Sequence, residues 1–260
     1  MKLYTKKIGA GKNIVLLHGW SFHSGIWSFV TDALSRYYHV ILIDLPGFGE
    51  TPFFFYTFDS LLDAIAAVVP EASVYVGWSL GGLLAMGMAN KFPQQVTSMV
   101  TVGSTPYFIA EKDWPGVSEE AFQDFYSAIK FDVKSTLEKF CFSLCAPSER
   151  ALYGALLYKI MMKKGCPSEA ALLTGLTVLH QTDLRVSVKK LLCPQLHVIG
   201  SEDKMAPSIL LKQYFSCIPR AKTQLMVEAG HVPFLTQPSQ FMQCIFNFLG
   251  HDDAIFPGKK

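Results

Sequence analysis

Short, continuously apolar runs alternate along this chain with longer segments of helical spacing, and this alternation constrains the fold more than any other feature. The apolar runs, which predict buried strands, occupy residues 13–17, 40–44, 73–77, 96–103, 195–200 and 223–227. The helical segments occupy residues 58–69, 80–92, 209–215 and 239–249, and Ser239 is the expected N-cap of the last one. Strands that are apolar on both faces and separated by helices are typical of a mostly parallel α/β sheet covered by helices on both faces.

The strand rhythm stops between about residues 107 and 185. Four helix-like blocks, punctuated by proline and glycine, occupy residues 119–128, 133–144, 148–164 and 168–181. The sequence therefore predicts a core formed by residues 1–107 and 186–260, with an inserted helical lid at residues 108–185. The polar tail at residues 251–260 contains proline and glycine and is expected to fray.

Composition argues against several functional classes. Half of the 260 residues are hydrophobic, which is enough to bury one large core, and the net charge of +2 is too small for a globally basic nucleic-acid binder. No window approaches the roughly 20 apolar residues of a membrane-spanning helix, and the apolar run at 14–17 is too short for a secretory signal. We therefore expect a cytoplasmic monomer that binds neither nucleic acid nor membrane.

Cysteine and glycine spacing gives no indication of a metal or a cofactor. The six cysteines form no Cys-x-x-Cys pair and no zinc-type cluster with histidine, so a reduced chain without metal is expected. Cys141 and Cys145 lie one helical turn apart and could imitate a metal pair, but no other ligand is close to them in the sequence. No Gly-x-Gly-x-x-Gly follows a strand and no Walker A sequence is present, so no cofactor is expected.

The sequence Gly-Trp-Ser-Leu-Gly at residues 77–81 falls between a predicted strand and a predicted helix. A serine on so sharp a turn is strained, its hydroxyl projects at the carboxyl edge of the sheet, and the flanking glycines leave room for neighbouring chain. The helix that begins at Leu80 directs its positive end to the same place. Ser79 is therefore the predicted nucleophile. The alternative is a serine that only caps a glycine-rich helix.

A serine hydroxyl needs a general base, and the chain offers seven histidines. His231 lies in a loop between the last predicted strand and the last predicted helix, where it can reach over the sheet edge. The other six are in polar, terminal, lid, strand or loop-shaping positions; they are His18, His23, His39, His180, His197 and His251. His231 is therefore the predicted base.

The carboxylate that orients the histidine is expected between serine and histidine in chain order. Asp203 follows the predicted strand at 195–200 and is favoured over Asp183, whose polar turn suits a salt bridge or helix end, and over the neighbouring Glu202. Its expected role is to hold the imidazole tautomer and stabilise the imidazolium. The oxyanion is expected to receive the backbone N–H groups of Leu80 and Trp20, although Trp20 could also be only an aromatic pocket wall.

Beyond these residues, the chain resembles the capped α/β-hydrolases along nearly its whole length. More narrowly, it is similar to the family of pimeloyl-[acyl-carrier protein] methyl ester esterases of biotin synthesis. The resemblance is carried by Leu-Leu-His-Gly-Trp at 16–20, Asp-Leu-Pro-Gly-Phe-Gly at 44–49, Gly-Trp-Ser-Leu-Gly-Gly at 77–82, Trp-Pro-Gly at 114–116 and Thr-Asp-Leu-Arg at 182–185. It implies an α/β-hydrolase fold and hydrolysis of the methyl ester on a pimeloyl chain borne by acyl carrier protein.

The resemblance also implies which residues meet the substrate. Trp20, Ser79, Leu80 and His231 would contact the reacting ester. A lid stretch would line the acyl channel; its members are Phe140, Cys141, Phe142, Ser143 and Leu144. The alternative for this stretch is the ordinary core of an amphipathic helix.

The resemblance also implies a lid that binds the acidic carrier, for which the family uses arginines. This chain departs from that pattern, because the basic residues between 130 and 165 are mostly lysines. The basic residues that could bind the carrier are Lys130, Lys134, Lys139, Arg150, Lys159 and Lys163, with Lys164 beside them. The acidic residues in the same stretch are Asp132, Glu138 and Glu149. A positively charged patch on helices could attract an acidic partner. The alternative is a charged helix surface that only contacts water.

Two other functions compete with this interpretation. The first is a different capped hydrolase, such as a broad carboxylesterase, a lipase-like enzyme or a carbon–carbon bond hydrolase. A serine at the nucleophile position argues against the dehalogenases and epoxide hydrolases of similar fold, which use aspartate. The second is a non-enzymatic binding protein, which would be expected to lack part of the Ser79, His231 and Asp203 set.

Overall fold

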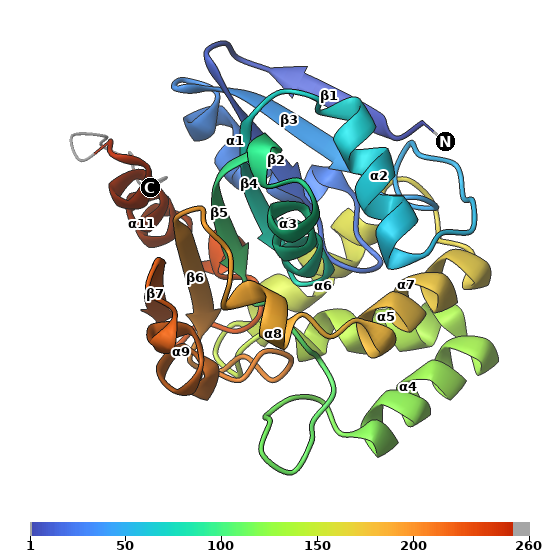
Figure 1. Cartoon of the computed structure of the whole chain (residues 1–260). Helices are drawn as coiled ribbons and strands as arrows, with labels where there is room; N and C mark the ends of the chain where they lie inside the picture. Colours follow the sequence, from blue (N-terminus) through green and yellow to red (C-terminus); the bar gives the residue numbers. More distant parts are fainter. Residues whose placement is uncertain (1, 252–260) are drawn as a thin grey trace.

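A seven-stranded sheet forms the centre of the computed structural model, which describes residues 2–251 (Figure 1). The strands are β1 (Tyr4–Ile8), β2 (Lys12–Leu17), β3 (Tyr38–Asp44), β4 (Ser73–Trp78), β5 (Val96–Val102), β6 (Gln195–Gly200) and β7 (Ala221–Met226). Their order across the sheet is β1-β3-β2-β4-β5-β6-β7, and only the pairing of β1 with β3 is antiparallel among these strands. The predicted mostly parallel α/β sheet is confirmed.

Strand β1 is absent from the sequence prediction. Its residues, Tyr-Thr-Lys-Lys-Ile, are mostly exposed or half-buried, because β1 forms the edge of the sheet and pairs on one side only. Charged residues are common on such edges, where they prevent pairing with another chain. The apolar runs of the buried strands therefore revealed the centre of the sheet but not this edge.

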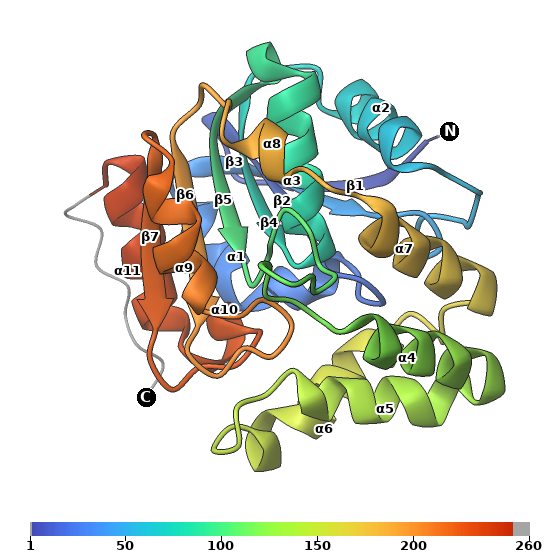
Figure 2. The same ribbon diagram turned by 60° about the horizontal axis from the view of Figure 1, so that its bottom comes forward.

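Helices cover both faces of the sheet. The helices of the core are α1 (Ser28–Leu34), α2 (Phe58–Val68), α3 (Leu80–Lys91), α8 (Arg185–Val188), α9 (Ile209–Gln213), α10 (Pro233–Thr236) and α11 (Pro238–Leu249), with 3₁₀ turns η1 (Ser24–Trp27), η2 (Pro93–Gln95) and η3 (Phe215–Cys217). Helices α1 and α11 pack together on one face, and α2, α3 and α8 lie on the other (Figure 2).

The last helix starts one residue earlier than expected. Pro238 occupies its first position and Gln237 its cap, with no side-chain capping bond, so the prediction of Ser239 as N-cap is wrong. Proline suits this first position because its missing N–H would have no helical partner there. His251 follows the helix and bonds through its ring to Tyr38 Oη at 2.9 Å. The rest of the tail expected to fray, residues 252–260, lies outside the described residues.

Four further helices follow β5 and precede α8, beyond the carboxyl ends of the strands (Figure 2). They are α4 (Glu119–Phe131), α5 (Val133–Ser143), α6 (Arg150–Met162) and α7 (Glu169–Gln181). Side chains cap three of them: Ser118 accepts from the N–H of Ala121, Asp132 caps α5, and Ser168 caps α7. Such caps satisfy N–H groups that the helix itself leaves unpaired. We call α4 to α7 the four-helix segment.

The chain leading into the four-helix segment and the chain leaving it meet at Arg185, the first residue of α8. Its guanidinium lies 4.4 Å from the ring centre of Tyr107 and 5.3 Å from that of Trp114. It also forms ion pairs of 2.7 Å with both Asp183 and Glu111. The Trp-Pro-Gly and Thr-Asp-Leu-Arg sequences, which are far apart in the chain, thus form one junction between the sheet and the four helices.

Replacing Arg185 with Met should loosen this junction without unfolding the chain. Met keeps the apolar stem but removes two ion pairs and the cation–π contacts. Because the Arg185 side chain is 26% exposed, we expect the free energy of unfolding to fall by only about 1 kcal/mol, or about 2–4 °C in Tm. Thermal unfolding followed by circular dichroism measures this, with the exposed Lys190→Met as the matched control. Equal Tm values for the two variants would contradict the prediction.

Candidate active site

Ser79 joins β4 to α3 in a strained conformation. Its φ of 54° and ψ of −118° lie in a region that non-glycine residues rarely adopt. The surrounding chain holds it there: the Ser79 N–H donates to the carbonyl of Val102 at 2.9 Å, and the Ser104 hydroxyl donates to the carbonyl of Ser79 at 2.8 Å. The strain is therefore fixed by bonds to β5 and the loop that follows it.

Glycines on both sides of Ser79 allow the helix to approach the strands. A Cβ on Gly77 would lie 2.1 Å from the carbonyl oxygen of Gly81, and a Cβ on Gly81 would lie 2.2 Å from that of Leu17. Contacts this short do not occur, so any side chain would push α3 away from β2 and β4. The spacing of the two glycines therefore has a steric cause.

Ser79 lines a large apolar cavity between the sheet and the four-helix segment. The cavity has a volume of about 660 Å³, and His231 and Trp20 also line it. Most of its wall is apolar, with contributions from Phe108, Ile109, Val117, Phe122, Phe125, Phe140, Leu176 and Leu179. The Ser79 side chain makes no capping bond to α3, which argues against the alternative that this serine only caps the helix.

A buried hydrogen-bonded pair joins Asp203 to His231. The carboxylate oxygens lie 2.9 and 2.8 Å from His231 Nδ1, and Oδ1 also accepts the N–H groups of Met205 and Ala206. These bonds hold the carboxylate in one orientation and stabilise its charge. With Nδ1–H donating to Asp203, the unprotonated nitrogen of a neutral His231 is Nε2.

Ser79 and His231 share the cavity, but no hydrogen bond joins their side chains within residues 2–251. In active sites without substrate, the bond between nucleophile and base is often long and shortens in the substrate complex. The arrangement can therefore supply a nucleophile and a base to one ligand.

Gly103 makes room for the Asp203–His231 pair and was missed by the sequence analysis, which treated it only as the end of a strand. Its φ is +51°, and its N–H donates to the carbonyl of Val198 at 2.8 Å. A Cβ there would lie 2.9 Å from His231 Nδ1 and 3.0 Å from Asp203 Oδ2. In the sequence, the only sign of this role was the presence of a glycine directly after a predicted buried strand.

The two backbone N–H groups predicted to receive the oxyanion belong to Leu80, next to Ser79 in the chain, and to Trp20, which lines the same cavity as Ser79. Leu80 is the first residue of α3, so its N–H has no partner in the helix. Within residues 2–251, neither this N–H nor that of Trp20 bonds to a protein acceptor. The Trp20 side chain serves separately as a wall: its Nε1–H donates to the carbonyl of Leu172 at 2.8 Å, and its ring contacts Phe140 edge-on.

The predicted channel stretch at residues 140–144 only partly faces the cavity. Phe140 and Ser143 line it, whereas Cys141 and Leu144 are buried elsewhere in the core. Phe142 is 37% exposed and packs beside α6. Residues three apart share a face of a helix, so a continuous run along α5 cannot all face one cavity.

The predicted basic residues divide into two places. Five of the six are exposed on or beside α4, α5 and α6; they are Lys130, Lys134, Lys139, Lys159 and Lys163. Lys139 also lines the cavity. Arg150 instead begins α6, at the end away from Lys159, and is half-buried. Lys164 forms an ion pair with Glu50 at 2.5 Å.

Neither rival acid forms a hydrogen bond to the His231 ring within residues 2–251. Asp183 pairs with Arg185 and lines a different groove, which contains neither Ser79 nor His231. Burial raises the pKa of the Asp183 carboxyl, but hydrogen bonds and charge from Arg185 outweigh this and lower it overall. Glu202 is exposed. Of the three candidates, the structure brings Asp203 to the histidine.

Two other buried histidines are fully bonded. His197 bonds to Thr101 and Gln195 and stacks on Phe215, and burial lowers its pKa to about 3. His18 accepts the N–H of Leu45 at Nε2, which leaves Nδ1 to donate to the adjacent carbonyl, and burial lowers its pKa to about 4 despite the nearby Asp44. His18 therefore ties together the loops after β2 and β3, as its position suggested.

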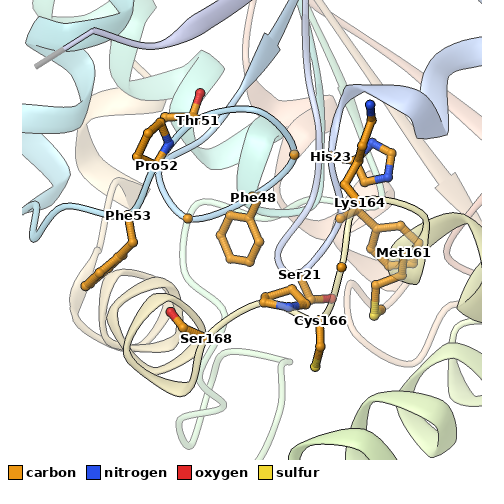
Figure 3. A pocket seen from close by; sticks show the side chains of 15 residues that line it. Ser21, His23, Phe48, Thr51, Pro52, Phe53, Met161, Lys164, Cys166 and Ser168 are labelled. Carbon is orange, nitrogen blue, oxygen red and sulfur yellow. The ribbon is translucent and has the colours of Figure 1, made fainter.

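A second cavity, of about 250 Å³, is shown in Figure 3 and is lined by Ser21, His23, Phe48 and Lys164 among others. His23 Nδ1 accepts the N–H of Gly25, and Nε2 donates to the carbonyl of Ile160 at 2.9 Å, so both ring nitrogens are used. Lys164 is paired with Glu50. This cavity thus offers its two serines, Ser21 and Ser168, no free histidine base among the described residues, and the Ser79 cavity is the candidate active site.

The described part of the chain contains no helix with the length and apolarity needed to cross a membrane. Nor do its histidines, cysteines and carboxylates form a cluster of three that could hold a metal ion. The Cys145 thiol, just beyond the carboxyl end of α5, points to the carbonyl of Cys141 at 3.8 Å.

The sequence profile of the alpha/beta hydrolase family matches residues 14–243, and the chain belongs to this family. It is 34% identical to the pimeloyl-[acyl-carrier protein] methyl ester esterase of Aeromonas hydrophila subsp. hydrophila, over 96% of this chain and 100% of that protein. It is 33% identical to the protein of the same name from Edwardsiella ictaluri, over 95% of this chain and 96% of the other.

Solved structures agree with this fold. The bromoperoxidase from Bacillus anthracis superposes with a TM-score of 0.87 at 24% identity, covering 95% of each chain. A thermophilic esterase from Thermogutta terrifontis superposes with a TM-score of 0.82 at 23% identity, covering 95% of this chain and 93% of the other. Family membership and the esterase names of the curated relatives make the chain an enzyme of the hydrolase class.

Gly103→Ala should displace the Asp203–His231 pair while leaving the sheet folded. Because a misplacement of about 1 Å near the reacting groups can lower a rate about 10²-fold, we expect kcat for ester hydrolysis to fall by about that factor. Gly165→Ala is the control, since Gly165 also has a positive φ, of 95°, but has nothing within 4 Å of an added Cβ. A similar loss of kcat in both variants would show that backbone strain, not crowding of the pair, is responsible.

Proposed function

We propose that this enzyme is a carboxylesterase that removes the methyl group from a pimeloyl methyl ester borne by acyl carrier protein, as a step in biotin synthesis. Ser79 is the nucleophile, His231 the general base and Asp203 the group that orients the base. The observation that carries this proposal is the buried Asp203–His231 pair beside the same apolar cavity that Ser79 lines. The names of the curated relatives support the choice of substrate.

The proposed reaction proceeds through an acyl-enzyme. His231 Nε2 takes the hydroxyl proton as Ser79 Oγ bonds to the ester carbonyl carbon, and the N–H groups of Leu80 and Trp20 receive the negative oxygen. The imidazolium then gives its proton to the departing methoxide, which leaves as methanol. Water then gives a proton to His231 as its oxygen bonds to the acyl carbon. The bond between this carbon and Ser79 Oγ breaks, the imidazolium returns its proton to Oγ, and the acid leaves. General-base catalysis contributes about 10²–10⁴-fold and each oxyanion donor about 10²–10³-fold. The proposed reaction uses no metal or cofactor.

The character of the cavity supports a neutral, apolar acyl chain. Its wall is mostly aromatic and aliphatic, and burying methylene groups against such a wall is favourable. A methyl ester carries no charge, whereas the carboxylate product would be costly to keep in an apolar site. The cavity would therefore favour binding of the ester and release of the acid.

The four-helix segment would act as the lid, residues 108–185, and its basic surface would receive the carrier. Lys130, Lys134, Lys159 and Lys163 are exposed and take part in no ion pair within residues 2–251. Cations near a cavity can attract an acidic protein and raise the rate of encounter. We propose a cytoplasmic monomer that meets its carrier at this surface.

The first test compares kcat/KM for the pimeloyl-carrier methyl ester with kcat/KM for a short p-nitrophenyl ester. We expect the carrier-bound ester to be strongly preferred, and both activities to be lost in Ser79→Ala while folding is kept. Comparable or better activity on the short ester would favour the alternative, a broad short-chain carboxylesterase. An active Ser79→Ala variant would refute the assigned nucleophile.

The orienting acid is tested by a pair of isosteric changes. Asp203→Asn keeps the shape but removes the charge that holds the His231 tautomer, so we expect kcat to fall by about 10³–10⁴-fold. Asp183→Asn breaks only a partly exposed salt bridge and should leave kcat near the wild-type value. Steady-state kinetics on a small ester measures both variants. The opposite pattern would mean that Asp183 is the acid.

Carrier docking is tested by reversing charge at Lys130 and Lys134, which are exposed and do not line the Ser79 cavity. Lys130→Glu with Lys134→Glu should raise KM about tenfold or more for the carrier-bound ester, because an acidic partner is repelled, and should leave KM for a small ester unchanged. Lys222→Glu, on strand β7 and exposed, is the matched control. Equal changes for the two substrates would contradict a docking role.

A further inference from the structure

The carboxylate of Glu149 is buried beneath the loop that carries His231. Glu149 is 8% exposed and lies in the turn between α5 and α6, which belongs to the four-helix segment. Its Oε2 accepts the N–H of Ala146, within the same turn, at 2.9 Å. The same oxygen accepts the N–H of Gly230, 81 residues further along the chain, at 3.0 Å. One carboxylate therefore joins the turn to the residue before His231.

The backbone of His231 itself is held on both sides. Its N–H donates to the carbonyl of Leu144 at 2.7 Å, and its carbonyl accepts from Nε1–H of Trp78 at 2.8 Å. The consecutive N–H groups of Gly230 and His231 therefore both end on the α5–α6 turn. Because the imidazole hangs from this peptide, the turn helps to set where the ring lies.

The turn and the loop are in contact too close for a side chain. A Cβ on Gly230 would lie 2.5 Å from the carbonyl oxygen of Leu144 and 2.6 Å from the nitrogen of Ala146. From the opposite side, a Cβ on Gly200 would lie 2.1 Å from the carbonyl oxygen of Gly230. The loop is thus confined between the end of β6 and the four-helix segment.

Burying the Glu149 carboxylate at this contact is energetically unfavourable unless its oxygens are hydrogen-bonded. Within residues 2–251, Oε1 of Glu149 is buried without a hydrogen-bond partner. Removing a charged oxygen from water without a partner is unfavourable, and only the two charge-assisted bonds of Oε2 offset it. One of those bonds stays within the turn, and the other fixes the peptide that carries His231.

We propose that Glu149 is a positioning residue for the hydrolytic reaction, acting through the Gly230–His231 peptide; this rests on the proposed function, in which His231 is the base. Glu149 does not line the cavity that Ser79 and His231 share. It therefore affects the rate of proton transfer and not the binding of substrate. It also couples the four-helix segment to the base, because its bonds tie the α5–α6 turn of this segment to the loop that carries His231.

The test uses the full chain and three Glu149 variants. Glu149→Ala removes both bonds, Glu149→Asp is one methylene too short to keep them, and Glu149→Gln keeps an acceptor oxygen of the same reach. Glu138→Gln, an exposed carboxylate on α5, is the matched control. Steady-state kinetics on p-nitrophenyl butyrate gives kcat and KM, and the rate of covalent labelling by a fluorophosphonate reports the reactivity of Ser79. Circular dichroism confirms that each variant is folded at the assay temperature.

We expect kcat and the labelling rate to fall about 10–100-fold in the Ala and Asp variants at unchanged KM, because a small displacement of the base is sufficient for this. The Gln variant should stay within about threefold of the wild type, since a neutral acceptor is weaker but correctly placed. If the Ala variant does not fold, the Asp variant decides.

Wild-type kcat in the folded Ala or Asp variant, or an equal loss in the Gln variant, would overturn the positioning role while the proposed chemistry stands. A wild-type chain that neither hydrolyses the ester nor becomes labelled would overturn the proposed chemistry, and the positioning role with it.

Discussion

The close approach of helix α3 to strands β2 and β4 is the constraint on which the rest of the site depends. It exists because Gly77 and Gly81 have no side chains where the two backbones meet. The approach allows Ser79 its strained conformation at the end of the sheet. Leu80 follows as the first residue of α3, so its N–H has no helical partner. The proposed nucleophile and one proposed oxyanion donor are thus neighbours at one turn of the backbone, and the bonds from β5 and Ser104 keep this turn from relaxing.

The histidine loop depends on contacts from two parts of the chain. The core supplies Asp203, which bonds the ring, and Trp78, which bonds the backbone carbonyl of His231. The four-helix segment supplies Leu144 and Glu149, which bond the N–H groups at and before the histidine. The four-helix segment therefore lines the cavity and also supports the backbone of His231, the proposed base, so a rearrangement of its α5–α6 turn would move the imidazole.

The apolar wall of the cavity affects both which substrates can bind and how strongly the polar groups inside it interact. Most of it is aromatic or aliphatic, and the polar groups near the reacting atoms are few and held in place. Such a site favours a neutral acyl chain, and it strengthens the hydrogen bonds between Asp203 and His231 because these groups are shielded from water. The core and the four-helix segment both contribute to the wall. The Trp20 side chain extends from the loop after β2 and donates a hydrogen bond to the carbonyl of Leu172 on helix α7.

Local sequence determined the central strands, most helices and the elbow, because each depends on hydrophobic periodicity or on glycine spacing within a few residues. It did not reveal edge strand β1, whose polar residues suit a strand paired on one side. It also misplaced the start of α11, because Pro238 is the first residue of the helix and Ser239 is not its N-cap. Chain order and loop position sufficed to favour Asp203 over Asp183. The steric role of Gly103, the burial of Glu149 and the division of residues 140–144 between cavity and core depend on which distant segments meet, and only the tertiary structure decided them.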